Sequence, residues 1–290
     1  LRSLVGSEMC IRDSAIAAHV VLAAVVLAAG NALAAGDAHA GGPAQPAPAT
    51  PAAPDSDRPP HYETPDMPFV PAPLRPVDIR GRTTVREGRY VSVQVNVDVS
   101  GNNIPGDAAN EPSLAIDPAD PSKLVIGWRQ FDTVTSNFRQ AGWAYSHDAG
   151  RTWIFPGKLE PGVFRSDPVL ETGVDGTVYY YSLSSTFSCE MFRSIDHGQT
   201  WLRPVRGFGG DKQWFAIDMT TGIGRGNIYA SWSTFGSPSG GATFTRSTDG
   251  GRSFEGPFTL PSVANWGTLA VGPDGTVYQV GTTGPNGSFN

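Results

Sequence analysis

Histidine, cysteine and charged residues are all scarce in this 290-residue chain. It has five histidines and two cysteines, and Asp, Glu, Lys and Arg together make up 17% of it. Cys10 and Cys189 lie in segments of very different composition, and no C-x-x-C spacing occurs, so we expect neither a disulfide between them nor a cysteine-ligated metal. We expect Cys189 to be a small buried residue rather than a nucleophile.

The positions of the histidines exclude further classes of site. Beyond residue 80 only His147 and His197 remain, and both occupy variable positions of a repeated turn. A Ser-His-Asp hydrolase or a His-ligated metal centre therefore has too few residues to be built. No glycine-rich phosphate loop and no helical periodicity is evident. We expect no metal and no cofactor.

Glycine and proline, by contrast, are abundant, with 35 Gly and 25 Pro beside 39% hydrophobic residues. This composition is typical of a turn-rich β protein preceded by an unstructured segment. The formal net charge of −6 is spread along the chain without a basic block, which argues against nucleic acid as a partner.

The first 79 residues divide into three segments that we set apart from the fold. Residues 1–14 resemble a translated sequencing adapter. Residues 15–35 form an apolar, alanine-rich run that ends in small residues, which predicts a signal peptide; the alternative is a transmembrane anchor. Residues 36–79 are a Pro/Ala-rich linker. We therefore expect a secreted or periplasmic protein without stable membrane insertion after signal cleavage, folded over residues 80–290.

One turn-like phrase occurs three times in the folded part. It reads SHDAGRTW at residues 146–153, SIDHGQTW at 194–201 and STDGGRSF at 247–254. Its central residues, Asp148, Asp196 and Asp249, are 48 and 53 residues apart. A period near fifty residues indicates a propeller or a solenoid.

A second repeated element precedes each phrase and occurs once more near the C-terminus. Each copy is an apolar strand, a Pro/Asp/Gly turn and another apolar strand, at residues 114–128, 169–182, 215–232 and 269–280. With the two strands that flank each phrase, a unit has four short strands. This pattern predicts an all-β propeller of four-stranded antiparallel blades. The alternating run at residues 90–99 predicts one further strand.

The repeated phrase resembles the Asp-box, or BNR repeat, of the sialidase superfamily, S-x-D-x-G-x-T-W. The first two copies match every specified position, and the third differs at Ser253 and Phe254. The resemblance implies a six-bladed disc. Counted from Ala108, residues 80–290 hold about three and a half blades, so we expect an incomplete propeller.

The box residues have a structural interpretation. The aspartates can accept backbone N–H bonds across their turns, the glycines supply a positive φ, and the aromatic residues point into the seams between blades. The alternative is a ligand or calcium role for the carboxylates. These residues are Asp148, Gly150, Trp153, Asp196, Gly198, Trp201, Asp249, Gly251 and Phe254.

Topology then predicts the functional face. In an up-and-down blade the boxes lie on one face of the disc, and the first strands begin on the opposite face. Charged residues gather there, which suits a polar ligand with apolar faces such as a sugar; the alternative is that they only tie blades together through ion pairs and caps. The predicted substrate-binding residues are Glu111, Arg129, Arg165, Asp167, Asp211, Lys212 and Trp214.

The resemblance also implies roles for particular residues. Family sialidases hold a sugar carboxylate with three arginines, the first in an R-I-P motif, where this chain has Asn110, Glu111 and Pro112. Their acid/base Asp precedes the first Asp-box by about a dozen residues, a position that Asp132 matches. Their nucleophilic Tyr comes from late blades, beyond Asn290.

We therefore expect a secreted, sialidase-like exo-glycoside hydrolase acting on glycans, with Asp132 as general acid. The first alternative is a non-catalytic propeller that binds glycan or protein through tryptophans of the same face, namely Trp128, Trp214, Trp232 and Trp266. The second is a part of a long structural array.

Overall fold

The computed structural model describes residues 83–282, so the three N-terminal segments and Cys10 lie outside the described residues. It begins with a hairpin of β1 (Thr84–Glu87) and β2 (Tyr90–Val93). The rest is strand and turn, and nothing in the described range forms a helix long and apolar enough to cross a membrane.

Three four-stranded antiparallel sheets follow one another along the chain, and a strand pair follows them. This confirms the predicted all-β fold of propeller-type blades. The first blade comprises β3 (Ala108–Ile116), β4 (Leu124–Phe131), β5 (Gln140–Ser146) and β6 (Ile154–Lys158). The second comprises β7 (Ser166–Thr172), β8 (Val178–Leu183), β9 (Cys189–Ser194) and β10 (Val205–Arg206). The third comprises β11 (Trp214–Ile217), β12 (Ile228–Ser231), β13 (Ala242–Ser247) and β14 (Glu255–Thr259), and the pair comprises β15 (Asn265–Val271) and β16 (Val277–Thr282).

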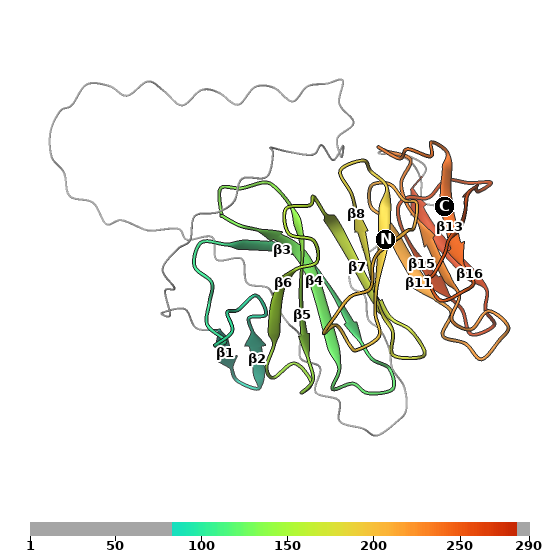
Figure 1. Ribbon diagram of the computed structural model, residues 1–290. Coiled ribbons are helices and arrows are strands. Elements are labelled where there is room, and N and C mark those ends of the chain that lie inside the picture. The colour runs from blue at the N-terminus through green and yellow to red at the C-terminus, as the bar shows by residue number, and fades with distance from the viewer. Residues whose placement is uncertain (1–82, 283–290) are drawn as a thin grey trace, which may run out of the picture.

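The sheets lie side by side in chain order, each facing the next (Figure 1). Their first strands are neighbours: β3 contacts β7, β7 contacts β11, and β11 contacts β15. The first strand of each unit is thus its inner strand. This order brings the starts of β3, β7, β11 and β15 together, although more than forty residues separate each from the next.

The apolar core is divided among the seams between sheets. Between the first two blades, Trp143 and Tyr180 pack edge-to-face against Trp201. The ring centroids of Trp143 and Trp201 are 6.4 Å apart, and those of Tyr180 and Trp201 are 5.9 Å apart. Trp143 also donates from Nε1 to the Gly198 carbonyl at 2.8 Å. Burial of aromatic side chains on this scale dominates local packing, so the seams fix the angle between blades.

The first Asp-box turn is closed by its own side chains. Ser146 Oγ donates to Asp148 at 2.8 Å, and Thr152 donates to Asp148 from its backbone N at 2.9 Å and from Oγ1 at 2.7 Å. Gly150 takes a φ of 77°, which glycine tolerates without strain, and its N–H reaches Ser146 Oγ. The carboxylate therefore serves as the acceptor that holds the turn.

The turns at Asp196 and Asp249 make the same bonds, and in the third turn Ser253 replaces the threonine. Trp201 packs in the seam between the first two blades, and Phe254 packs in the next one. The second and third turns thus each supply one aromatic ring to a core that two blades share, whereas Trp153 of the first turn packs with Val95 and with residues of the first blade itself.

The predicted strand at residues 90–99 is shorter than expected, because pairing ends at Val93. Val95 and Val97 are buried, as their alternation indicates. Asp98, however, accepts backbone N–H bonds from Ser100 and Asn102, each at 2.8 Å, and these bonds close a turn. The alternation indicates burial correctly at Val95 and Val97 but not at Val99, which is fully exposed, because the side-chain bonds at Asp98 compete with a continued ladder.

Candidate functional site

The inner strands share one irregularity at their starts. The β-sheet register shifts between Asn110 and Ser113 in β3, and at the equivalent places in β7 and β15. The second residue of each irregular step has left-handed backbone. The residues in this position, with the matching one just before β11, are Glu111 (φ 50°), Asp167 (φ 47°), Lys212 (φ 53°) and Trp266 (φ 47°).

A non-glycine residue in this conformation costs about 1–2 kcal/mol, so the surroundings must hold it. A bulge also re-aims side chains that a regular ladder would send to alternate faces. Here the left-handed residue recurs four times, three of them within a bulge, and it gathers one side chain from the start of each inner strand. Two of these four are acidic, one is basic and one is aromatic.

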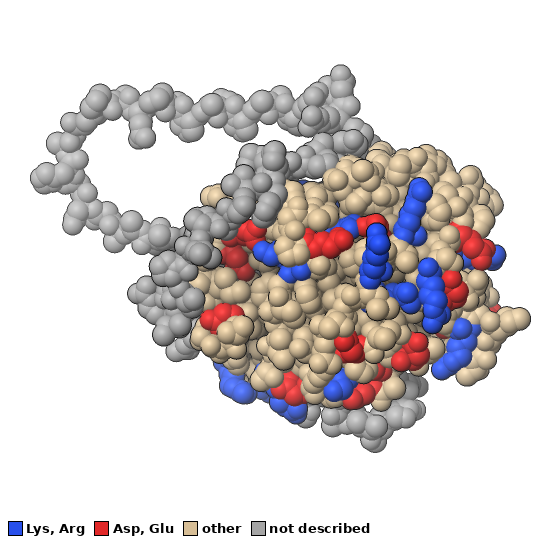
Figure 2. Space-filling view, viewed as in Figure 1, with Lys and Arg blue, Asp and Glu red and all other residues tan. Residues whose placement is uncertain are grey.

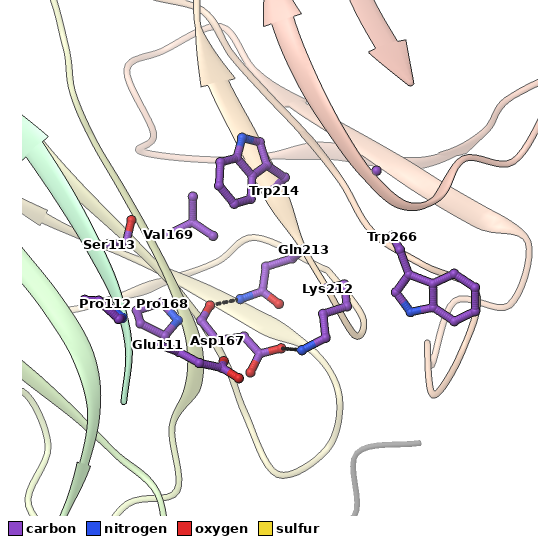
Figure 3. A pocket seen from close by; sticks show the side chains of 11 residues that line it. Glu111, Pro112, Ser113, Asp167, Pro168, Val169, Lys212, Gln213, Trp214 and Trp266 are labelled. Atoms are coloured by element: carbon purple, nitrogen blue, oxygen red, sulfur yellow. Dashed lines mark hydrogen bonds and ion pairs between the residues drawn. The ribbon is translucent and has the colours of Figure 1, made fainter. Parts of the chain in front are cut away.

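A cavity of about 340 Å³ lies over these bulges (Figure 3). Figure 3 shows Glu111, Asp167 and Lys212 gathered on one side of it and Trp214 on another. The residues that line it are Glu111, Pro112, Ser113, Asp167, Pro168, Val169, Lys212, Gln213, Trp214, Trp266 and Gly267. A cavity of this size, with an apolar wall and a few convergent polar groups, is typical of a small-ligand site.

Ion pairs connect the charged residues across blades. Arg129, at the end of β4, pairs with Glu111 at 2.9 Å and with Asp167 of the next blade. Lys212 Nζ lies 3.3 Å from the other oxygen of Asp167. Elsewhere, over the face shown in Figure 2, basic and acidic side chains are interspersed. In the cluster at the cavity, the positive charges of Arg129 and Lys212 balance the acidic side chains of Glu111 and Asp167.

The two acids of the cluster have pKa values shifted in opposite directions. Burial and the negative charge of Asp167 raise the pKa of Glu111, against the opposing effect of Arg129. Burial acts to raise the pKa of Asp167 as well, but the charges of Arg129 and Lys212 outweigh it and hold that pKa below its usual value. Protonated Glu111 can donate a hydrogen bond to Asp167. The pair thus combines a carboxyl group that binds its proton more tightly than usual with one that binds it less tightly.

Asp211 lies beneath this pair and is fully buried. Neither of its carboxylate oxygens meets a hydrogen-bond donor in good geometry. Burial raises the pKa of Asp211 to about 6, against the opposing charge of Lys212. Gln213 is also buried and donates to the backbone carbonyl of Asp167. Its amide fixes the bulge of the neighbouring blade.

Two tryptophans provide the apolar surface of the cavity. The side of Trp214 is open, because the residue is 40% exposed. Trp266 is stacked on Phe235, with the ring centroids 4.9 Å apart and the planes 12° apart. Stacking on Phe235 holds the Trp266 indole in place, while the Trp214 indole stays accessible. A flat ligand therefore has a surface on which to stack.

The structure brings most of the predicted substrate-binding residues together, but Arg165 lies apart from the cavity lining. Its guanidinium pairs with Glu160 and Glu190 and lies 5.2 Å from the ring centroid of Phe192. Arg165 thus connects the loop between β6 and β7, which holds Glu160, to β9, which holds Glu190. Asp132 is likewise not among the lining residues: Lys158 Nζ lies 2.6 Å and Gln140 Nε2 2.9 Å from its oxygens. Its role as general acid stays a prediction.

Two of the four tryptophans considered for ligand binding are in the core, so that expectation was wrong for them. Trp128 is 2% exposed and donates to Gln130 at 2.7 Å; Trp232 is 1% exposed and donates to Ser237 at 3.0 Å. Trp128 lies within β4 and Trp232 directly follows β12, near the predicted face, but both side chains are buried. Cys189 is buried as predicted, and burial raises its thiol pKa well above the usual value.

Arg139 is a functional candidate that the sequence reasoning did not name. It immediately precedes β5, on the loop between β4 and β5, and burial lowers its pKa while the charges of Asp167 and Asp211 oppose that shift. It therefore lies within electrostatic range of the cluster. The sequence marks Arg139 only by its position, because the loop between β4 and β5 lies on the same face as the inner-strand starts.

Metal binding finds no support in the described range, where no three His, Cys, Asp or Glu side chains lie together as a metal site would require. No protein-family model and no curated protein sequence matches the chain.

Solved structures do resemble it. The Hadza microbial sialidase Hz136 aligns at a TM-score of 0.42 and 16% identity, over 62% of this chain and 40% of that one. The NanB sialidase from Streptococcus pneumoniae aligns at a TM-score of 0.45 and 14% identity, over 66% and 30% of the chains. An α-L-arabinofuranosidase from Fusarium graminearum aligns at 0.46 and 12%, over 65% and 59%. The chain thus spans less than half of the two sialidases, and the likeness concerns the fold.

Proposed function

We propose that the chain acts on glycans as a glycoside hydrolase and binds one sugar unit in the cavity over the inner-strand bulges. One observation carries the proposal: an accessible indole and two touching carboxyl groups with oppositely shifted pKa values line the same cavity. Indole faces stack on apolar faces of sugars. Two carboxyl groups with divergent pKa values are the usual chemical equipment for cleaving a glycosidic bond.

In this proposal Glu111 is the proton donor and Asp167 stabilises charge. Glu111 gives its proton to the glycosidic oxygen while the bond to the anomeric carbon breaks. Asp167 keeps its negative charge, because Arg129 and Lys212 flank it, and it stabilises the positive charge that develops on the sugar ring. Water then adds to the anomeric carbon. Its oxygen becomes the new hydroxyl group, and its released proton returns to Glu111.

The resemblance at the sequence level favours a different proton donor, Asp132. Its oxygens are both engaged inside the first blade, by Lys158 and Gln140. Glu111 lines the cavity, and its side chain is 44% exposed, so it has direct access to a bound ligand. These contacts favour Glu111, and the two assignments are separated by experiment.

Hydrolysis of chromogenic aryl glycosides, including a sialoside, by the full chain is the test. Glu111→Gln should lower kcat by about 10²-fold or more, the usual contribution of a general acid. Asp132→Asn should keep most of the activity, and the reverse result would transfer the role to Asp132. Glu160→Gln is the matched control, because Glu160 also pairs with an arginine but does not line the cavity. If no glycoside is cleaved, the hydrolase assignment is wrong.

One observation favours a second candidate, a non-catalytic glycan-binding propeller. Each oxygen of Asp167 already has a cationic partner, Arg129 on one side and Lys212 on the other. That arrangement suits a fixed binding surface. For this function Trp214→Ala should weaken retention on a glycan matrix, with no hydrolysis by any sample.

A further inference from the structure

Arg129, a predicted substrate-binding residue, is already bound by carboxylates of the chain itself. Its side chain is 7% exposed, and it pairs with Glu111 on one side and Asp167 on the other. A carboxylate on a sugar would have to displace one of these partners to form a bidentate pair with the guanidinium. That exchange replaces a positioned ion pair, so it yields little net binding free energy.

Arg165 is occupied in the same way. Its side chain is 5% exposed, and its guanidinium bonds to Glu160 at 2.8 Å and also to Glu190. It does not line the cavity. Of the two arginines that the sequence marks at the inner-strand starts and strand ends, neither offers a surface to a ligand.

The charged residues that do line the cavity also disfavour an anionic ligand. They are Glu111, Asp167 and Lys212, and Lys212 is paired with Asp167 at 3.3 Å. A ligand carboxylate entering here would face two acidic side chains and one cation that is already paired. Placing like charges together is unfavourable, so an anionic sugar is disfavoured.

Arg139 does not change this balance. It lies within electrostatic range of Asp167 and Asp211, and its guanidinium lies 5.8 Å from the ring centroid of Phe164. It is not among the residues that line the cavity. Its positive charge therefore offsets buried acids of the chain and is not presented to the cavity.

We propose that the cavity selects an uncharged sugar and rejects sugars that carry a carboxylate, with Glu111 and Asp167 as the residues that determine this choice. The proposal rests on the proposed carbohydrate function. It departs from what the Asp-box resemblance implies, because a sialoside carries the carboxylate that this cavity has no free cation to receive. Trp214 then supplies most of the affinity, through stacking on the sugar ring.

Matched pairs of glycosides test the choice directly. The probes are methyl galactoside with methyl galacturonide, methyl glucoside with methyl glucuronide, and methyl α-sialoside with its methyl ester. Binding to the full chain is followed by tryptophan fluorescence and by saturation-transfer NMR. In each pair that binds, the uncharged member should bind about tenfold tighter or more, because the carboxylate charge is the main difference between the two members.

The variants then test which residues determine the preference. At a pH where Glu111 is ionised, Glu111→Gln removes one negative charge from the cavity and one partner from Arg129, so it should narrow the ratio of affinities between the members of a pair. Asp167→Asn should narrow it further, and Glu111→Gln alone suffices if that variant does not fold. Glu160→Gln should leave the ratio unchanged, since it alters charge outside the cavity.

The outcomes separate the two proposals. Tighter binding of the acidic members by the unmodified chain would overturn the selection while leaving the carbohydrate function standing. An unchanged ratio in Glu111→Gln would show that Glu111 does not determine the choice. If no member of any pair binds, the proposed function itself is wrong, and the selection is wrong with it.

Discussion

Arg129, at the end of the second strand of one blade, forms a buried ion pair with Asp167, at the start of the inner strand of the next blade. The pair joins two sheets directly beneath the cavity. It also sits on a bulge whose left-handed residue is Asp167 itself. One contact therefore stabilises the fold and sets the charge of the site.

Removing one partner of that pair should be strongly destabilising. In Asp167→Ala the guanidinium of Arg129 stays buried and loses a buried carboxylate partner, so we expect a loss of about 3–5 kcal/mol in the free energy of unfolding. Glu111→Gln should lose less, because its side chain is 44% exposed. Urea denaturation followed by tryptophan fluorescence measures both. Equal small losses would mean that the pair adds little to stability.

Gly127 tests how tightly the first seam is packed. A Cβ at this position would overlap the Tyr180 ring and lie 2.7 Å from Leu170 Cδ1, both in the next blade. Overpacking of this kind costs about 1–3 kcal/mol, so Gly127→Ala should lower Tm clearly. Gly241→Ala is the matched control, because a Cβ there meets no atom within 4 Å. If both variants melt alike, the seam is looser than the contacts indicate.

Much of the fold could be predicted from the sequence, because strand alternation and the repeated Asp-box phrase occur at blade spacing. The positions at inner-strand starts were likewise predictable, and Glu111, Asp167 and Lys212 do line the cavity. These predictions depend only on the order of strands and turns, which short-range pattern determines.

The direction of each side chain was beyond that reasoning. Arg165 and Asp167 are two residues apart at the start of one strand, yet Asp167 lines the cavity while Arg165 binds Glu160 and Glu190. Alternation fails there because the bulge changes which way successive residues point. The prediction for Trp128 is wrong for a related reason, since a large aromatic residue within a strand can face either the core or the ligand. Long-range packing decides between them.

Asp211 should make stability depend on pH in an unusual direction. Its pKa is raised to about 6 from an ordinary value of 3.8, so the folded state binds the proton more tightly than the unfolded state. The penalty for ionising it in the fold is absent below pH 4 and complete above pH 6. Stability should therefore fall as pH rises between these values, by about 1–3 kcal/mol from this residue.

The variant Asp211→Asn removes the charge but keeps the shape. It should melt close to the unmodified protein at pH 4 and above it at pH 7, and thermal melts across this range measure the difference. Asp249→Asn is an informative control in the same blade. Burial acts to raise the pKa of Asp249, but hydrogen bonds from Ser253 and Ser247 lower it to about 2. Its contribution is present above pH 4 and lost as pH falls toward 2, so this variant should be less stable than the unmodified protein at pH 7 and approach it in acid. If the difference in Tm between Asp211→Asn and the unmodified protein does not grow from pH 4 to pH 7, Asp211 ionises in the fold without cost. A donor such as the Lys212 amide or bound water would then stabilise its charge.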